Sequence, residues 1–114
     1  MSLLTTLTSL LTSLGFDVQT SIHVGTPPDT YIVLTPLSES FDAFADNNPE
    51  INIEEVRISL FTKSNYLADK QTIETALLSS GLTITDRKYQ EYEQDTGYHH
   101  YVIDVETYEF IGGN

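Results

Sequence analysis

Apolar residues recur with helical spacing at the start of the chain. Leucine occupies positions 3, 4, 7, 10, 11 and 14, and Thr or Ser fills most positions between them. This spacing places the leucines on one side of a helix, and Gly15 is typical of the position just past a helix end. Since Thr and Ser are poor helix formers, such a helix needs a core to pack against. The pattern predicts an amphipathic helix over residues 3–14 whose leucines enter the core.

The spacing then changes to the alternation that is typical of strands. Residues 16–24 alternate between apolar and polar, residues 25–29 read Gly-Thr-Pro-Pro-Asp, and residues 30–34 are apolar on both faces. We therefore expect a strand with one solvated face, a turn and a central strand. The turn composition predicts that these two strands pair as an antiparallel hairpin.

The periodic pattern is lost over residues 36–50. This segment is acidic, contains Phe41 and Phe44, and has no basic residue. Long loops in small domains are often functional, so the sequence predicts a long acidic loop at about 36–50. Strand character returns at Ile51, and the alternation slips by one place at residues 54–55, which predicts a bulge or two separate segments.

A second helix and a final hairpin complete the pattern. Asn65 is a suitable N-cap for a helix that runs to about Ser80, with Gly81 beyond its end. A strand over residues 82–92, a turn at residues 95–97 and a last strand follow. The apolar face of that last strand carries Tyr101, Ile103 and Val105.

The order of these elements is α-β-β-loop-β-α-β-β, and 114 residues are the length of one domain, 1–114. It predicts an α+β fold in which two helices pack on one face of an antiparallel four- to five-stranded sheet. We expect charged residues and tyrosines on the opposite face.

Charge narrows the range of functions. The chain has 17 acidic and 5 basic residues, a formal charge of −12, and no cysteine. This balance argues against gripping nucleic-acid phosphates or an anionic membrane surface. No segment approaches the roughly 20 apolar residues of a membrane helix, so we expect a soluble protein made in the cytoplasm. Six acids without a base occupy residues 39–55, six more occupy 91–109, and all five bases lie between 57 and 88.

The sequence offers little for catalysis. Asp95-Thr96-Gly97 spells the aspartic-protease tripeptide, but Glu93-Gln94 before it and Tyr98 after it differ from the residues that those enzymes require. Hairpin-turn chemistry explains the tripeptide better, and a protease dimer remains an alternative. His99 and His100 are neighbours on a strand and point to opposite faces, so they do not chelate one ion together. We expect no enzymatic activity, cofactor or metal site.

Four segments, taken together in order and spacing, resemble the small tail completion, or tail-to-head joining, proteins of long-tailed (siphovirus-type) phages and prophages of Gram-positive bacteria. The resemblance runs over nearly the whole chain and is carried by Pro28-Asp29-Thr30-Tyr31-Ile32, Ala45-Asp46-Asn47, Ile58-Ser59-Leu60-Phe61-Thr62-Lys63-Ser64-Asn65-Tyr66 and Tyr92-Glu93-Gln94-Asp95-Thr96-Gly97-Tyr98-His99.

The resemblance implies a tail-terminator-like fold and a structural virion protein that completes the tail at the head–tail junction. It implies a ring of copies of the chain, usually a hexamer, between the tail tube protein and the head connector proteins. DNA passes through such a ring without specific binding, and neither enzymatic activity nor a membrane is implied.

Exposed aromatic and polar residues of the acidic segment and of the second helix start are the candidate assembly interface: Phe41, Phe44, Asp46, Asn47, Asn65 and Tyr66. An alternative function is an acidic DNA mimic that inhibits a host DNA-binding enzyme. A mimic should present its carboxylates in two rows along one elongated face.

Overall fold

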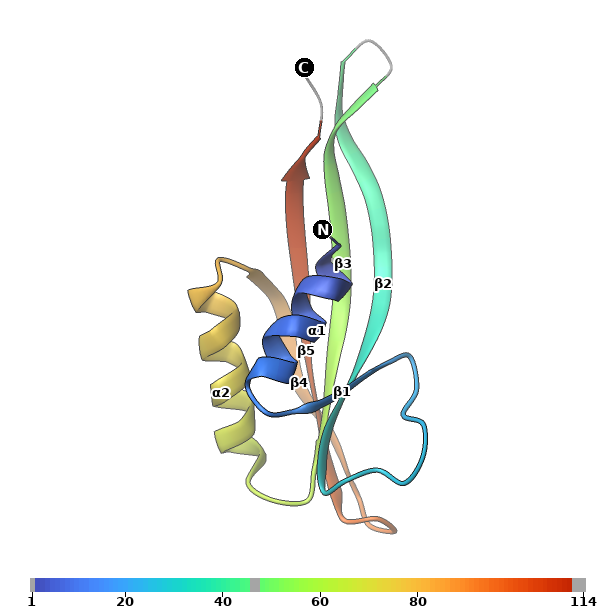
Figure 1. Ribbon diagram of the computed structural model, residues 1–114, viewed down its shortest axis with the longest axis vertical. Coiled ribbons are helices and arrows are strands. Elements are labelled where there is room, and N and C mark those ends of the chain that lie inside the picture. Colours follow the sequence, from blue (N-terminus) through green and yellow to red (C-terminus); the bar gives the residue numbers. More distant parts are fainter. Residues whose placement is uncertain (1, 46–47, 112–114) are drawn as a thin grey trace.

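Five strands form one sheet, and both helices lie on the same side of it (Figure 1). The computed structural model describes residues 2–45 and 48–111, and at 43–45 and 49 it describes only the backbone. The elements in chain order are α1 (Leu3–Ser13), β1 (Asp17–Thr20), β2 (Thr30–Ala45), β3 (Asn48–Thr62), α2 (Tyr66–Ser79), β4 (Thr83–Glu93) and β5 (Tyr98–Phe110). The strand order in the sheet is β1-β2-β3-β5-β4. The α+β class, the five strands and the two helices on one face are as predicted.

Both helices begin and end where the sequence indicates. The Ser2 side chain accepts a hydrogen bond from Thr5 N–H at the start of α1, and Asn65 Oδ1 accepts from two backbone N–H groups at the start of α2. Gly15 and Gly81, just past the two helices, have φ of +96° and +77°, which favours glycine. On α2, Ile73 and Leu77 are buried, Ala76 is half-buried and Ser80 is exposed.

The core lies between the helices and the sheet. Side chains of β2, β3 and β5 that point toward the helices alternate along each strand, as half-buried strands require. The fully or nearly buried members of this core are Leu3, Leu7, Leu11, Ile32, Leu34, Val56, Ile58, Leu60, Ile73, Leu77, Tyr101, Ile103 and Val105. We call the side of the sheet that faces away from the helices the open face.

The predicted hairpin between β1 and β2 is wrong. The two strands pair in parallel, with Asp17 opposite Tyr31 and Thr20 opposite Leu34. Residues 21–29 therefore carry the chain back along the strand before β2 begins. Two consecutive prolines at 27–28 lack the N–H groups that a tight hairpin ladder uses, which is why this turn-like composition makes a return connection. The sheet is thus mixed, not wholly antiparallel.

The predicted acidic loop over residues 36–50 is also wrong for the described residues. Residues up to Ala45 continue β2, residues from Asn48 belong to β3, and the two strands pair along this whole length. The slip in alternation at 54–55 does not interrupt β3. An extra residue on the partner strand, Leu37, shifts the register there, so the bulge lies on β2.

The far ends of three strands project beyond α1 and form what we call the arm: residues 38–45 of β2, 48–55 of β3 and 106–110 of β5 (Figure 1). The remaining residues form the body. The arm lengthens the molecule, whose extents are 54 × 25 × 22 Å. β1 does not reach the arm, and β4 begins at its base, where Thr83 pairs with Glu106. Beyond this base, the described part of the arm is three strands wide and has no helix over it.

Candidate functional site

The predicted interface residues lie at two ends of the molecule. Phe41 is on the arm and its side chain is 56% exposed. Phe44 also belongs to the arm, where only its backbone is described, and Asp46 and Asn47 lie outside the described residues. Asn65 and Tyr66 follow the opposite end of β3, a strand of 15 residues. The structure therefore does not bring the predicted residues together into one site.

Asn65 and Tyr66 have clear structural contacts. Asn65 Oδ1 caps α2 by accepting hydrogen bonds from Leu67 N–H (3.0 Å) and Ala68 N–H (3.4 Å). The Tyr66 ring is half-buried and packs 5.0 Å from the Tyr89 ring and 5.2 Å from the His99 ring. These contacts hold α2 on the sheet, so the two residues shape the body.

An exposed apolar group on the arm was missed by sequence reasoning. Ile51 pairs with Phe110 and Ile53 pairs with Tyr108 across β3 and β5, so all four side chains lie on the open face. Tyr108 and Phe110 are 60% and 69% exposed. The slip in alternation was the available signal, since it moves the apolar positions of β3 from the helix side to the open face.

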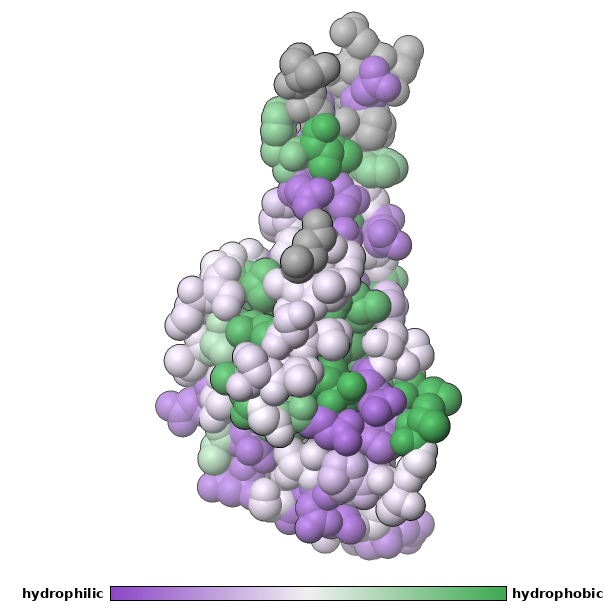
Figure 2. All heavy atoms as spheres, viewed as in Figure 1, coloured by the Kyte–Doolittle hydropathy of each residue, from purple (hydrophilic) through white to green (hydrophobic). Residues whose placement is uncertain are grey.

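Hydrophilic and hydrophobic residues are interspersed along the arm, where Figure 2 shows purple and green patches side by side. Glu55 lies opposite Glu106 on the open face, and Glu39 lies opposite Glu54 on the helix side. Like charges in directly opposite positions destabilise a sheet slightly. The arm thus combines exposed apolar groups with acidic residues, and its segments contain no Lys or Arg.

The Tyr108 hydroxyl donates a hydrogen bond to a Glu106 carboxylate oxygen. This bond raises the pKa of Tyr108, because the carboxylate stabilises the protonated phenol. Tyr108 therefore stays neutral, and its hydroxyl is hydrogen-bonded to one member of the Glu55–Glu106 pair.

The open face of the body carries an aromatic stack and an ion pair. The Phe61 ring stacks 4.8 Å from Tyr31 and 4.2 Å from His100. Burial lowers the pKa of His100, despite the opposing effect of nearby carboxylates. Beside this stack, Arg57 donates two hydrogen bonds to Asp104, at 2.8 and 3.1 Å, and the hydrogen bond raises the pKa of Arg57.

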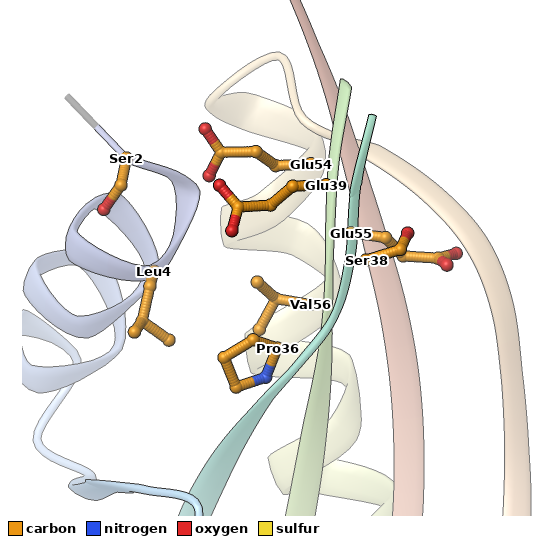
Figure 3. Close-up of a pocket in the computed structure, with 8 residues that line it drawn as sticks. All are labelled: Ser2, Leu4, Pro36, Ser38, Glu39, Glu54, Glu55 and Val56. Atoms are coloured by element: carbon orange, nitrogen blue, oxygen red, sulfur yellow. The ribbon is translucent and has the colours of Figure 1, made fainter. Parts of the chain in front are cut away.

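A small pocket of about 150 Å³ separates α1 from the base of the arm (Figure 3). Leu4, Pro36 and Val56 line it, and Glu39 and Glu54 point into it. Glu54 already accepts hydrogen bonds from Leu3 N–H (3.0 Å) and from the Asn52 side chain (2.9 Å). A carboxylate at a helix N-terminus stabilises that helix, so Glu54 fastens α1 to the arm.

The tripeptide Asp95-Thr96-Gly97 forms a turn. Thr96 and Gly97 N–H both donate to the Glu93 carbonyl oxygen, and Gly97 has a φ of +81°. His99 and His100 point to opposite faces: His99 accepts or donates a hydrogen bond with the Tyr89 hydroxyl (3.0 Å), and His100 lies in the open-face stack. Within residues 2–45 and 48–111, no three metal-ligating side chains gather around one point. No helix in that part of the chain is long and apolar enough to cross a membrane.

Four described acids at the base of the arm are divided between two faces, whereas a DNA mimic should present its carboxylates in two rows on one face. Glu39 and Glu54 lie on the helix side, whereas Glu55 and Glu106 lie on the open face. Negative charge therefore surrounds the arm.

Comparison with known proteins shows a shared fold. No protein-family model and no curated protein matches the sequence. Among solved structures, the chain is similar to one in the virion of a native gene transfer agent (GTA) particle. The TM-score is 0.56 with 15% sequence identity, and the match covers 90% of this chain and 82% of that chain. At this identity the similarity establishes the fold alone.

Proposed function

We propose that this protein is a structural protein of a tailed phage, a prophage or a related particle, where it completes the tail and joins it to the head connector. The observation that carries the proposal is the similarity in fold, over 90% of the chain, to a chain of a virion particle. The four segments that resemble tail completion proteins, among them residues 28–32 and 92–99, independently favour the same class.

In this proposal, copies of the chain form a ring, a hexamer by the resemblance, at the head–tail junction of the virion. The tail tube protein and the head connector proteins are its neighbours, and DNA passes through the ring. A formal charge of −12 supports this passage, because like charge keeps phosphates from adhering to the protein. The subunit is made in the bacterial cytoplasm and carries out no enzymatic step.

The test is deletion of the gene from the phage or prophage that encodes it. We expect DNA-filled heads and separate tails under the electron microscope, and we expect a plasmid copy of the gene to restore joined particles. Mass spectrometry of purified wild-type particles should detect the chain. Joined, infectious particles from the deletion strain, with the chain absent from wild-type particles, would contradict the proposal.

A further inference from the structure

The sheet has two free edges, and they lie on opposite sides of the molecule. β4 is the last strand of the order β1-β2-β3-β5-β4, so within the described residues its outer edge over Thr83–Glu93 has no partner strand. At the other side, β1 pairs with residues 31–34 of β2, and from residue 35 onward no other strand in the described part of the chain pairs with the outer edge of β2. Contact between two different surfaces of identical chains is head-to-tail, and such contacts form a ring when the rotation from copy to copy closes.

The two edges differ in charge. Residues 57–88 contain five bases and three acids, a formal charge of +2, whereas the rest of the chain contains fourteen acids and no base. β4 contributes Arg87 and Lys88 to the positive segment, and the free edge of β2 contributes acids only. Copies of a chain with a charge of −12 repel one another, so this pairing of segments is the one that reduces the repulsion.

The charges also match face by face. Glu39 lies on the helix side of β2, and Arg87 lies on the helix side of β4, where it pairs with Glu74 of α2 at 2.9 Å. Asp42 lies opposite Ile51 on the open face, and Lys88 lies opposite Val102 on the same face. Lys88 is the one base that makes no ion pair or ring contact with the described part of the chain.

We propose that the free edge of β2 in one copy lies against β4 of the next copy, with Glu39 facing Arg87 and Asp42 facing Lys88. The inference rests on the proposed ring and names the contact that builds it. The contact is made by side chains, because Pro36 and the register shifts at both ends of the Asp86–Tyr89 segment interrupt a continuous hydrogen-bond ladder between the edges.

Zero-length cross-linking of the unmodified protein tests this contact. Unlabelled and heavy-isotope-labelled chains are mixed, treated with a carbodiimide that joins lysine to carboxylate, and digested for mass spectrometry. We expect a cross-link of mixed label between the Lys88 peptide and the peptide with Glu39 or Asp42. Lys63, 3.8 Å from Asp29 in the same chain, should give a same-label product as the internal control. Lys88 products that are only same-label, or mixed-label products only at other sites, overturn the proposal.

Charge reversal sharpens the test. Lys88→Glu removes the amine that forms the Lys88 cross-link, so loss of that product is expected with or without the contact. Asp42→Lys added to it supplies a new amine, and a mixed-label product that joins residue 42 to residue 88 should appear at a yield at least about tenfold above that of Lys88→Glu alone. Lys63→Glu is the matched control and should leave the Lys88 cross-link unchanged. Loss of the Lys88 cross-link in Lys63→Glu as well would overturn the specific pairing. So would the absence of a mixed-label product from residue 42 when Asp42→Lys is added to Lys88→Glu.

The proposed virion function and the proposed contact between β2 and β4 can be contradicted independently of each other. A mixed-label Lys88 cross-link from a chain that is absent from particles leaves the contact standing and removes the virion function. A chain that is present in particles but gives no such cross-link leaves the function standing and removes this contact.

Discussion

The arm and the body share three strands, β2, β3 and β5, but the side chains of these strands meet different surroundings in the two regions. In the body, Leu34, Ile58 and Ile103 form one row across β2, β3 and β5 and are fully buried under the helices. In the arm, Phe41 and Phe110 extend the outer two of these strands and are more than half exposed. Backbone pairing between β2, β3 and β5 thus extends the sheet well beyond its hydrophobic core. The extension leaves apolar side chains exposed, where a second surface could bury them.

The largest expected difference between the two regions is in side-chain truncation. Ile58→Ala should lower the free energy of unfolding by about 3 kcal/mol, because it leaves a cavity in a fully buried row. Phe41→Ser on the arm should change it by less than about 0.5 kcal/mol, because the side chain is 56% exposed. Chemical denaturation measures both values, and head–tail joining by particles that carry Phe41→Ser should be blocked.

A large loss of folding stability in Phe41→Ser would show that the arm has a core of its own. Normal joining by a stable Phe41→Ser protein would remove this side chain from the proposed assembly surface.

The next effect concerns the ion pair on the open face of the body. Asp104→Ala should cost about 2 kcal/mol of folding stability, because the Asp104 side chain is only 9% exposed and Arg57 loses both of its hydrogen bonds to it. Asp29→Ala breaks the exposed pair with Lys63 and should cost less than about 0.5 kcal/mol. Thermal unfolding of the two variants makes the comparison. Equal losses would mean that the open face is as solvated as the turn that holds Asp29.

Capping of α2 gives a smaller effect, confined to the body. Asn65→Ala removes the acceptor for two backbone N–H groups and should lower stability by about 1 kcal/mol. Ser79→Ala, at the exposed far end of the same helix, should be nearly neutral. Urea midpoints measure both changes. If Asn65→Ala also prevented assembly while the protein stayed folded, the helix start would belong to an interface after all.

The smallest expected effect is a pH dependence centred on His100. Burial lowers the pKa of His100 in the folded state, so below about pH 6.5 the unfolded chain binds a proton more readily than the folded one. Folding stability should therefore fall as the pH drops from about 6.5 toward the folded-state pKa of His100. Above about pH 6.5, His100 should have no effect on folding stability. The loss between pH 7.5 and pH 5.5 should be smaller in His100→Gln, measured by denaturation at each pH. An equal loss in both proteins would assign the dependence to the carboxylates.

The body was largely predictable from the sequence because regularly spaced apolar residues mark the core-facing side of its main elements and distinguish it from the other side. The leucines of α1 and the alternation of Tyr101, Ile103 and Val105 on β5 report that asymmetry directly. Parallel pairing of β1 with β2 was not predictable, since it depends on how residues 21–29 return along the sheet and not on local spacing.

The structure of the arm could not be predicted from apolar spacing in the same way. Both of its faces meet solvent, so residues 38–45 show no apolar alternation, and their strand conformation comes from pairing with β3. The open-face apolar group joins residues 51 and 53 to residues 108 and 110, which only the register of β3 and β5 brings together. Of the predicted site, Phe41 lies on this exposed arm, whereas Asn65 is a helix cap.

The position of β5 in the sheet has a consequence for the newborn chain. β5 is synthesised after the other four strands of this sheet, yet it lies between β3 and β4. Until it leaves the ribosome, the β2–β3 hairpin exposes a long unpaired strand edge of the kind that aggregates. Glu50, Glu54 and Glu55 on that edge repel identical strands from neighbouring nascent chains. We therefore expect the acidity of the arm to limit association between nascent chains during translation, before any partner is present.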